Sequence, residues 1–176
     1  DVLICGENSA ELPYIHAISA TNGAYLWSRR FSRCAHGENF LDFFRLNGQI
    51  WIRGEYETNG DWNWSGLDPL TGETQREIIS KQYVKGCAPD SASAKYLICG
   101  KSTFFDLETG ERTDIRSGRS VCGHGWMPAN GMLYTFPTDC ACNPYLRGDM
   151  AMAPGSASTN PAAGLLIEGP AYGVSL

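Results

Sequence analysis

Cysteine and histidine side chains supply the most reactive groups of this sequence. The chain has seven cysteines, and Cys122, Cys140 and Cys142 lie near His124 in its C-terminal part. Thiolates and an imidazole together suit zinc or copper. The alternative is two disulfides, in which Cys87 bonds either Cys140 or Cys142 and Cys122 bonds the other. We expect the disulfides, which form in an oxidising compartment outside the cytoplasm.

Aromatic side chains form a second candidate site, this time for binding. Tyr56, Trp62 and Trp64 lie in a segment, 54–66, that also contains asparagine, aspartate and glycine. Exposed aromatic rings stack on sugar rings, while the polar neighbours hydrogen-bond to sugar hydroxyls. The alternative is that Trp62 or Trp64 packs between structural repeats. Both interpretations of this segment are open.

Composition excludes several classes of function. The formal net charge is −5, and no dense lysine and arginine cluster is present, so we expect no nucleic-acid partner. No apolar run approaches the roughly 20 residues of a membrane-spanning helix. The chain opens on Asp1 and a strand-like run, 2–5, without a signal peptide, so a signal has been removed or the chain is a piece of something longer.

A repeat positions these side chains. The pattern Asp-x-x-Thr-Gly occurs at 68–72 and 106–110, with the variant Ser-Ala-Thr-Asn-Gly at 19–23 and a degenerate copy ending at Gly148. Asp or Ser at the start of a turn accepts hydrogen bonds from backbone amides, and the glycine supplies a positive φ. Each copy therefore predicts a tight turn between two strands.

Asparagine–glycine pairs mark a second turn in two of the repeats. They occur at 47–48 and 130–131, each before an apolar run, and such a pair is a strong hairpin signal. The segment 73–85, which has some helical character, we also predict to be a strand.

The sequence thus predicts an all-β fold, a β-propeller with about four blades of four strands. The predicted blades are residues 1–40, 41–85, 86–120 and 121–154. Residues 155–176 are predicted to be a linker and a C-terminal tail or final strand.

The first repeat carries a resemblance to a known family. Residues 17–27 resemble the tryptophan-docking repeat of quinoprotein alcohol dehydrogenase-like propellers, whose pattern is Ala-x-Asp-x-x-Thr-Gly-x-x-x-Trp. Ser19 and Asn22 depart from that pattern, and the later copies lack the tryptophan. The resemblance implies that Trp27 packs between neighbouring blades and that Gly23 makes the turn.

The C-terminal part, from Cys122 through 128–134 to 169–172, is similar to secreted bacterial PQQ-binding-like propeller repeat proteins. That family's dehydrogenases hold PQQ with calcium, often beside a pair of adjacent cysteines. This chain has no adjacent cysteines and no visible calcium loop, so we predict no cofactor and no catalytic residue.

The expected function is a non-catalytic binding module or scaffold outside the cytoplasm. Its expected partners are other protein chains or further blades of the same protein, and a glycan is a further possibility. Two alternatives stay open: a PQQ- or metal-dependent oxidoreductase, and a structural segment of a larger multidomain surface protein.

Overall fold

The computed structural model describes residues 1–7, 13–31, 43–54, 62–82, 84, 88–100, 103–115, 118, 120–137 and 148–153. These residues form fourteen β-strands and no helix, so the all-β prediction is confirmed. No helix within them is therefore long and apolar enough to cross a membrane. Residues 74–80, within the segment that has some helical character, form a strand as predicted.

The strands build four antiparallel sheets, each from strands that follow one another in the chain. The first sheet contains β1 (Val2–Glu7), β2 (Tyr14–Ser19) and β3 (Tyr25–Arg30). The second contains β4 (Phe43–Leu46), β5 (Gln49–Arg53), β6 (Trp62–Leu67) and β7 (Thr74–Ser80). The third contains β8 (Ser91–Ala92), β9 (Tyr96–Cys99), β10 (Thr103–Asp106) and β11 (Arg112–Asp114). The fourth contains β12 (Met127–Ala129), β13 (Met132–Thr135) and β14 (Met150–Met152).

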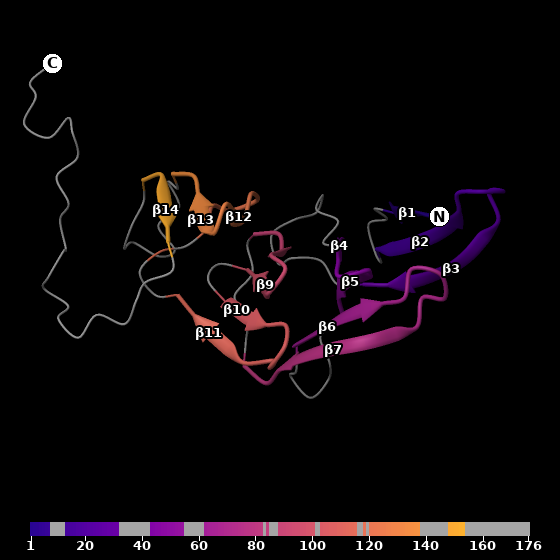
Figure 1. The fold of residues 1–176 in the computed structure, drawn as a ribbon, viewed down its shortest axis with the longest axis horizontal. Helices are drawn as coiled ribbons and strands as arrows, with labels where there is room; N and C mark the ends of the chain where they lie inside the picture. Colours follow the sequence, from indigo (N-terminus) through magenta and orange to yellow (C-terminus); the bar gives the residue numbers. More distant parts are fainter. Residues whose placement is uncertain are drawn as a thin grey trace, which may run out of the picture.

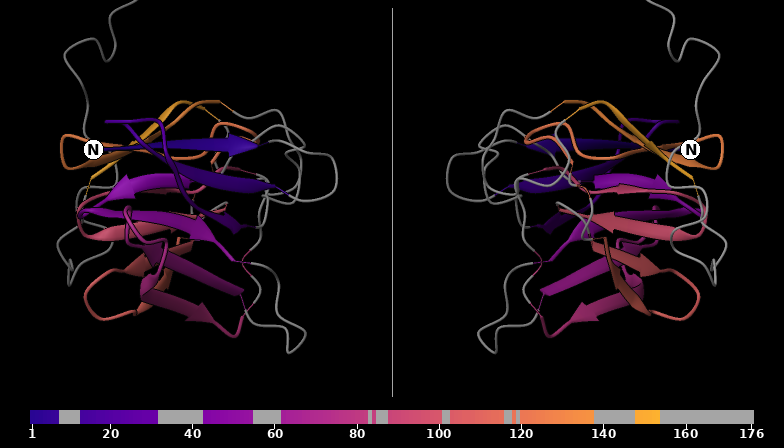
Figure 2. Two further views of the ribbon diagram at one scale, coloured as in Figure 1. Left: turned by 90° about the vertical axis from the view of Figure 1, so that its right-hand side faces the viewer. Right: turned by 90° about the vertical axis from the view of Figure 1, so that its left-hand side faces the viewer.

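The four sheets fan out around a common centre (Figure 1). The first sheet lies on the right of that view, the second and third below, and the fourth on the left. Strands β1, β4 and β12 lie near the centre, and β3, β7, β11 and β14 lie away from it. The strands of the four sheets run in roughly the same direction across the view (Figure 2). The described sheets therefore occupy one side of the centre, face against face.

The predicted repeat turns share one hydrogen-bond pattern. In the second sheet the Asp68 carboxylate accepts the amides of Leu70 and Thr71 at 2.8 and 3.0 Å. The amide of Gly72 donates to the Asp68 carbonyl at 2.9 Å, and its φ is 71°. The amide donors of Thr71 and Leu70 stabilise the ionised carboxylate, so they hold the pKa of Asp68 below its ordinary value.

The third sheet repeats this turn, and the first keeps most of it. Asp106 accepts the amides of Glu108 and Thr109 at 2.8 and 3.0 Å, which lowers its pKa, with Thr109 the larger cause. Gly110 has a φ of 74°. In the first sheet, where serine stands at the aspartate position, Ser19 Oγ accepts the amide of Thr21 at 3.3 Å. The turn prediction is therefore confirmed at 19–23, 68–72 and 106–110.

The asparagine–glycine turns are also confirmed. Asn47 and Gly48 have φ values of 49° and 80°, and Asn130 and Gly131 have 52° and 72°. Two consecutive positive φ values are those of the type I′ turn that fits the twist of a hairpin. Gly148, in contrast, is not a repeat turn, because it lies two residues before β14 instead of after it.

One cross-strand pair recurs in all four sheets. It joins β1 to β2, β5 to β6, β9 to β10 and β13 to β14. In the first three sheets the second strand of the pair leads into the repeat turn. The pairs are Leu3 with Ile18, Ile50 with Leu67, Leu97 with Phe105, and Leu133 with Met152. Side chains of directly opposed residues lie on the same face of a sheet. We call this the pair face of each sheet, and the other side its back face.

The core lies between neighbouring sheets. One buried cluster packs the back face of the first sheet, with Ile15 and Trp27, against the pair face of the second, with Ile50 and Leu67. The other cluster lies between the second and third sheets. Its members are Trp51, Trp64, Ile78, Val84, Leu97, Cys99, Phe105 and Leu107. The second and third sheets thus each bury their pair face against the back face of the sheet before it.

Contacts between turns join the sheets at one end. The Trp27 indole donates to the Pro69 carbonyl at 3.0 Å, and its ring covers Gly72, where a Cβ would lie 2.6 Å from Trp27 Cδ2. Trp27 therefore packs between two sheets on the next repeat turn. Arg76 takes the tryptophan position in the second repeat, and its guanidinium donates to the Glu108 carbonyl at 3.4 Å. The docking of one repeat on the next turn thus continues without the tryptophan.

Candidate functional site

The tryptophans of the predicted binding segment lie at the other end of the second sheet. Trp64 is buried, and its ring packs 5.1 Å from that of Phe105 in the third sheet. Its indole donates to Asp90 at 2.7 Å, so its ring contributes to the core and is not exposed to stack on a sugar. Trp62 is half-buried, beside the Arg53 guanidinium at 5.7 Å. Tyr56 lies outside the described residues.

A buried ion pair lies beside these two tryptophans. Arg53 ends β5, and its Nε donates to Asp90 at 3.0 Å. The two side chains are 0% and 1% exposed, and the Gly100 amide also donates to Asp90 at 3.1 Å. A buried carboxylate needs such compensation. Asp90 thereby connects the second sheet to the third. This pair could not be predicted from the sequence, because its residues lie far apart in the chain and outside the repeat turns.

The cysteine predictions fall mostly on residues that are not described. Cys87, Cys140 and Cys142 lie outside the described residues, and the pairing of Cys122 stays a prediction with them. Cys122 lies in a turn closed by the bridge between Val121 and Gly125. No disulfide joins two of the three cysteines that the structure describes.

The predicted metal alternative is also only partly visible. His124 Nδ1 lies 3.3 Å from the Cys122 carbonyl, and its ring packs edge-on against Phe136 at 6.3 Å. Among the described residues no group of three or more histidine, cysteine, aspartate or glutamate side chains is arranged to hold a metal ion. The zinc or copper site therefore stays an untested alternative.

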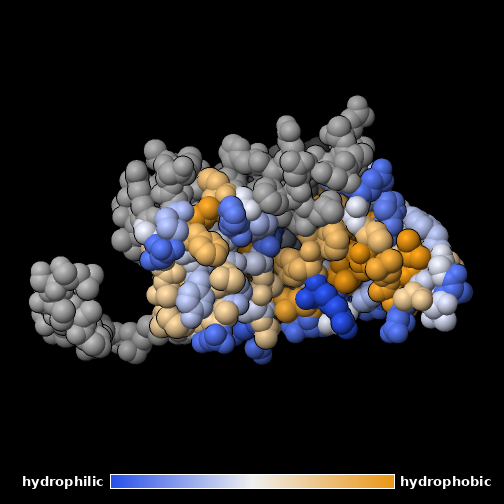
Figure 3. Space-filling model, turned by 90° about the horizontal axis from the view of Figure 1, so that it is seen from above, coloured by the Kyte–Doolittle hydropathy of each residue, from blue (hydrophilic) through white to orange (hydrophobic). Residues whose placement is uncertain are grey.

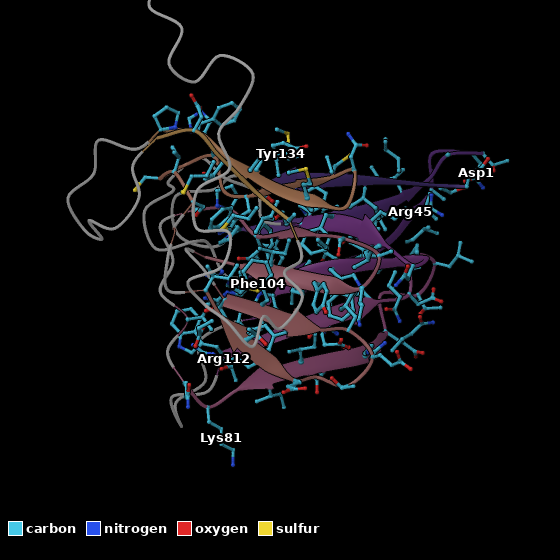
Figure 4. The ribbon with its side chains drawn as sticks, turned by 60° about the vertical axis from the view of Figure 1, so that its left-hand side comes forward. Asp1, Arg45, Lys81, Phe104, Arg112 and Tyr134 are labelled. Atoms are coloured by element: carbon cyan, nitrogen blue, oxygen red, sulfur yellow. The ribbon has the colours of Figure 1, made fainter. Side chains whose placement is uncertain are left out.

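A groove lies between the third and fourth sheets. It has a volume of about 1050 Å³. The third sheet lines it with its back face and the fourth with its pair face. The main lining side chains are Tyr96, Ile98, Phe104, Thr113, Ile115, Pro128, Leu133 and Met152. Figure 4 labels Phe104 on one wall.

This groove is the counterpart of the two packed interfaces. In those, large side chains such as Trp27 and Trp64 fill the space between sheets. Here Leu133 and Met152 are only half-buried, although their counterparts Leu97 and Phe105 are fully buried. The third repeat has Asp114 at the position of Trp27, so no tryptophan reaches across from that strand. This substitution is the sequence signal that could have predicted the groove.

The groove is mainly apolar, with one cation at its edge. Lys95 lines it, and its Nζ lies 3.6 Å from Asp106 and 5.3 Å from the centre of the Tyr96 ring. Two methionines, Met132 and Met152, contribute flexible and polarisable surface. Methionine-rich surfaces adapt to irregular apolar partners. The groove therefore suits an apolar segment that carries a negative charge near Lys95.

Comparisons with known proteins identify no family for the chain. No protein-family profile matches it. It is similar to a DegV domain-containing protein of Deinococcus radiodurans, with 32% identity over 85 residues. The match covers 48% of this chain and 27% of that protein, so the chain spans about a quarter of the relative's length.

Proposed function

We propose that the four sheets are successive blades of a β-propeller that acts as a non-catalytic binding module. The recurring cross-strand pair carries this proposal, because it presents an equivalent face in each sheet, with Ile50 and Leu97 in equivalent places. The contacts of Trp27 and Arg76 with the next repeat turn support the same order. Radially arranged antiparallel sheets around a centre are the propeller architecture.

The partner that the groove favours is a protein segment. The groove volume of about 1050 Å³ lies just above the range of small-molecule sites, which is roughly 300–1000 Å³. Its walls present apolar side chains such as Phe104 and Leu133, and its charge comes from Lys95. An extended peptide places apolar side chains and an acidic residue along such a groove. A glycan would need a denser set of hydrogen-bonding side chains than these walls offer.

Selection from a displayed library of random linear peptides tests this proposal. The purified chain is the bait, and Thr113→Trp is the blocked variant, because Thr113 is an exposed strand residue that lines the groove. Glu77→Trp, on the exposed side of β7, is the matched control. We expect apolar peptides with an acidic residue, which bind Thr113→Trp at least about tenfold more weakly and Glu77→Trp unchanged.

Two results would contradict the binding site. One is that no peptide is enriched over an unrelated bait. The other is that enriched peptides, or glycans tested on an array, bind Thr113→Trp as well as they bind the unaltered chain. Folding of both variants is checked by circular dichroism, so that a loss of binding reports on the groove alone.

The proposal includes a location outside the cytoplasm, supported by the seven cysteines. Alkylation of the denatured, unreduced protein, followed by intact mass, counts the free thiols. We expect fewer than seven labels, and seven would contradict the disulfides. The native mass also tests the PQQ- or metal-dependent alternative, which requires a mass excess equal to the bound group.

A further inference from the structure

The pair face of the first sheet is exposed, although its counterparts are buried. Leu3 is 55% exposed, whereas Ile50 and Leu97, at the same place in the next two sheets, are 4% and 0% exposed. Ile18 is half-buried, whereas its counterparts Leu67 and Phe105 are buried. Tyr25, opposite Ile18 in β3, is 61% exposed. This face therefore has the apolar residues of an interface between sheets, but no described sheet packs against it.

The back face of the fourth sheet is exposed in the same way. Tyr134 follows Leu133 as Trp51 follows Ile50, and Trp51 is buried against the next sheet while Tyr134 is half-buried. Met127, directly opposite Tyr134 in β12, is 50% exposed. Figure 4 labels Tyr134 on this sheet. The back face thus offers an aromatic ring, a methionine and the small side chain of Ala151, opposite Tyr134 in β14.

The two exposed faces are of opposite kinds. Each packed interface joins the back face of one sheet to the pair face of the next. The first sheet leaves a pair face, and the fourth leaves a back face. The exposed back face of the fourth sheet is therefore of the kind that packs against a pair face, and the first sheet exposes a pair face. Apolar residues also gather over the first and second sheets on the side of β1 and β4 (Figure 3).

We propose that two copies of this chain associate head to tail, with the fourth sheet of each against the first sheet of the other. A head-to-tail contact forms a closed ring when its rotation closes, and otherwise an open filament. The four sheets fan over one side of their centre, so a two-fold axis through that centre brings a second copy to the open side (Figure 1). The result is a ring of eight sheets.

Closure favours the ring over a longer chain of copies. The first contact between two copies holds the remaining two faces near each other, so the second contact forms at a high effective concentration. This inference rests on the propeller arrangement proposed above, and it is independent of what binds the groove. Peptide selection and self-association therefore fail separately.

Sedimentation velocity of the purified chain, over a range of concentrations, tests the proposal. We expect twice the mass of the 19.3 kDa chain, with no larger species as the concentration rises. Leu3→Glu alters the pair face and Met127→Glu alters the back face, and each should raise the dimer dissociation constant at least about tenfold. Leu70→Glu is the control, since Leu70 is 63% exposed at the tip of a repeat turn. Tyr25→Glu is a second pair-face variant if Leu3→Glu does not fold.

Mixing the variants identifies the orientation. Leu3→Glu keeps its back face and Met127→Glu keeps its pair face, so an equimolar mixture retains one intact contact and should form a one-to-one pair. Neither variant should do so alone. A monomer at all concentrations, growth into longer species, or self-association of either variant alone as tight as that of the unaltered chain would overturn the head-to-tail ring.

Discussion

Asp90→Asn removes the charge that compensates a buried guanidinium. The Asp90 carboxylate accepts hydrogen bonds from Arg53 Nε and Nη2, the Trp64 indole and the Gly100 amide. An amide side chain has one acceptor oxygen and brings two donors, so it cannot satisfy this set. Breaking a buried pair from one side costs about 3–5 kcal/mol. That is a large part of the roughly 5–15 kcal/mol that stabilises an ordinary domain.

Urea unfolding followed by tryptophan fluorescence measures this loss, because Trp64 lies at the ion pair. A loss of about 3–5 kcal/mol corresponds to a decrease in melting temperature of roughly 6–20 °C for a chain of this size. Glu77→Gln makes the same chemical change on an exposed strand and should change stability by no more than about 0.5 kcal/mol. A loss below about 1 kcal/mol for Asp90→Asn would refute the reasoning.

The other predictions concern the repeat turns. Gly110→Ala should lower the free energy of unfolding by about 1–2 kcal/mol through its positive φ alone. Gly72→Ala should lower it more, since its Cβ would also meet the Trp27 ring. Thermal unfolding of both variants tests this order. Trp27→Ala should cost about 3–5 kcal/mol in urea unfolding, and a loss under about 1 kcal/mol would contradict its docking role. Because the folded pKa values of Asp68 and Asp106 are lowered, their contribution to stability is present above the unfolded pKa of about 3.9 and is lost as pH falls through the folded value. The double variant Asp68→Asn, Asp106→Asn should therefore lose less stability than the unaltered chain in acid titrations below about pH 4, and equal losses would count against the turn bonds.

The turns could be predicted because their chemistry is local. The carboxylate of Asp68 reaches amides only two and three residues away, and Gly72 supplies the φ that the turn needs. Asn47 and Asn130 are similar cases, each followed by a glycine in a type I′ turn. The strands on either side of such turns followed from the same pattern.

Contacts between sheets were harder to predict. Arg53 and Asp90 meet only because two sheets pack together, and no spacing in the sequence marks them. Trp64 was one of two open interpretations until its burial placed it in the core. The match of Gly148 to the repeat failed because the register of Leu133 with Met152 puts the corresponding position after Met152. Register depends on strand pairing, which a single motif does not encode.

The open groove also has a consequence for how the protein unfolds. No residue of β12, β13 or β14 belongs to the two buried clusters that join the first three sheets, so local opening that detaches the fourth sheet requires less free energy than opening of β5, β6 or β9. Its backbone amides should then exchange with solvent sooner than those of the central sheets. A segment that fills the groove raises this cost by mass action. A partner bound in the groove would thus complete the packing of the fourth sheet and slow the exchange of backbone amides throughout β12–β14.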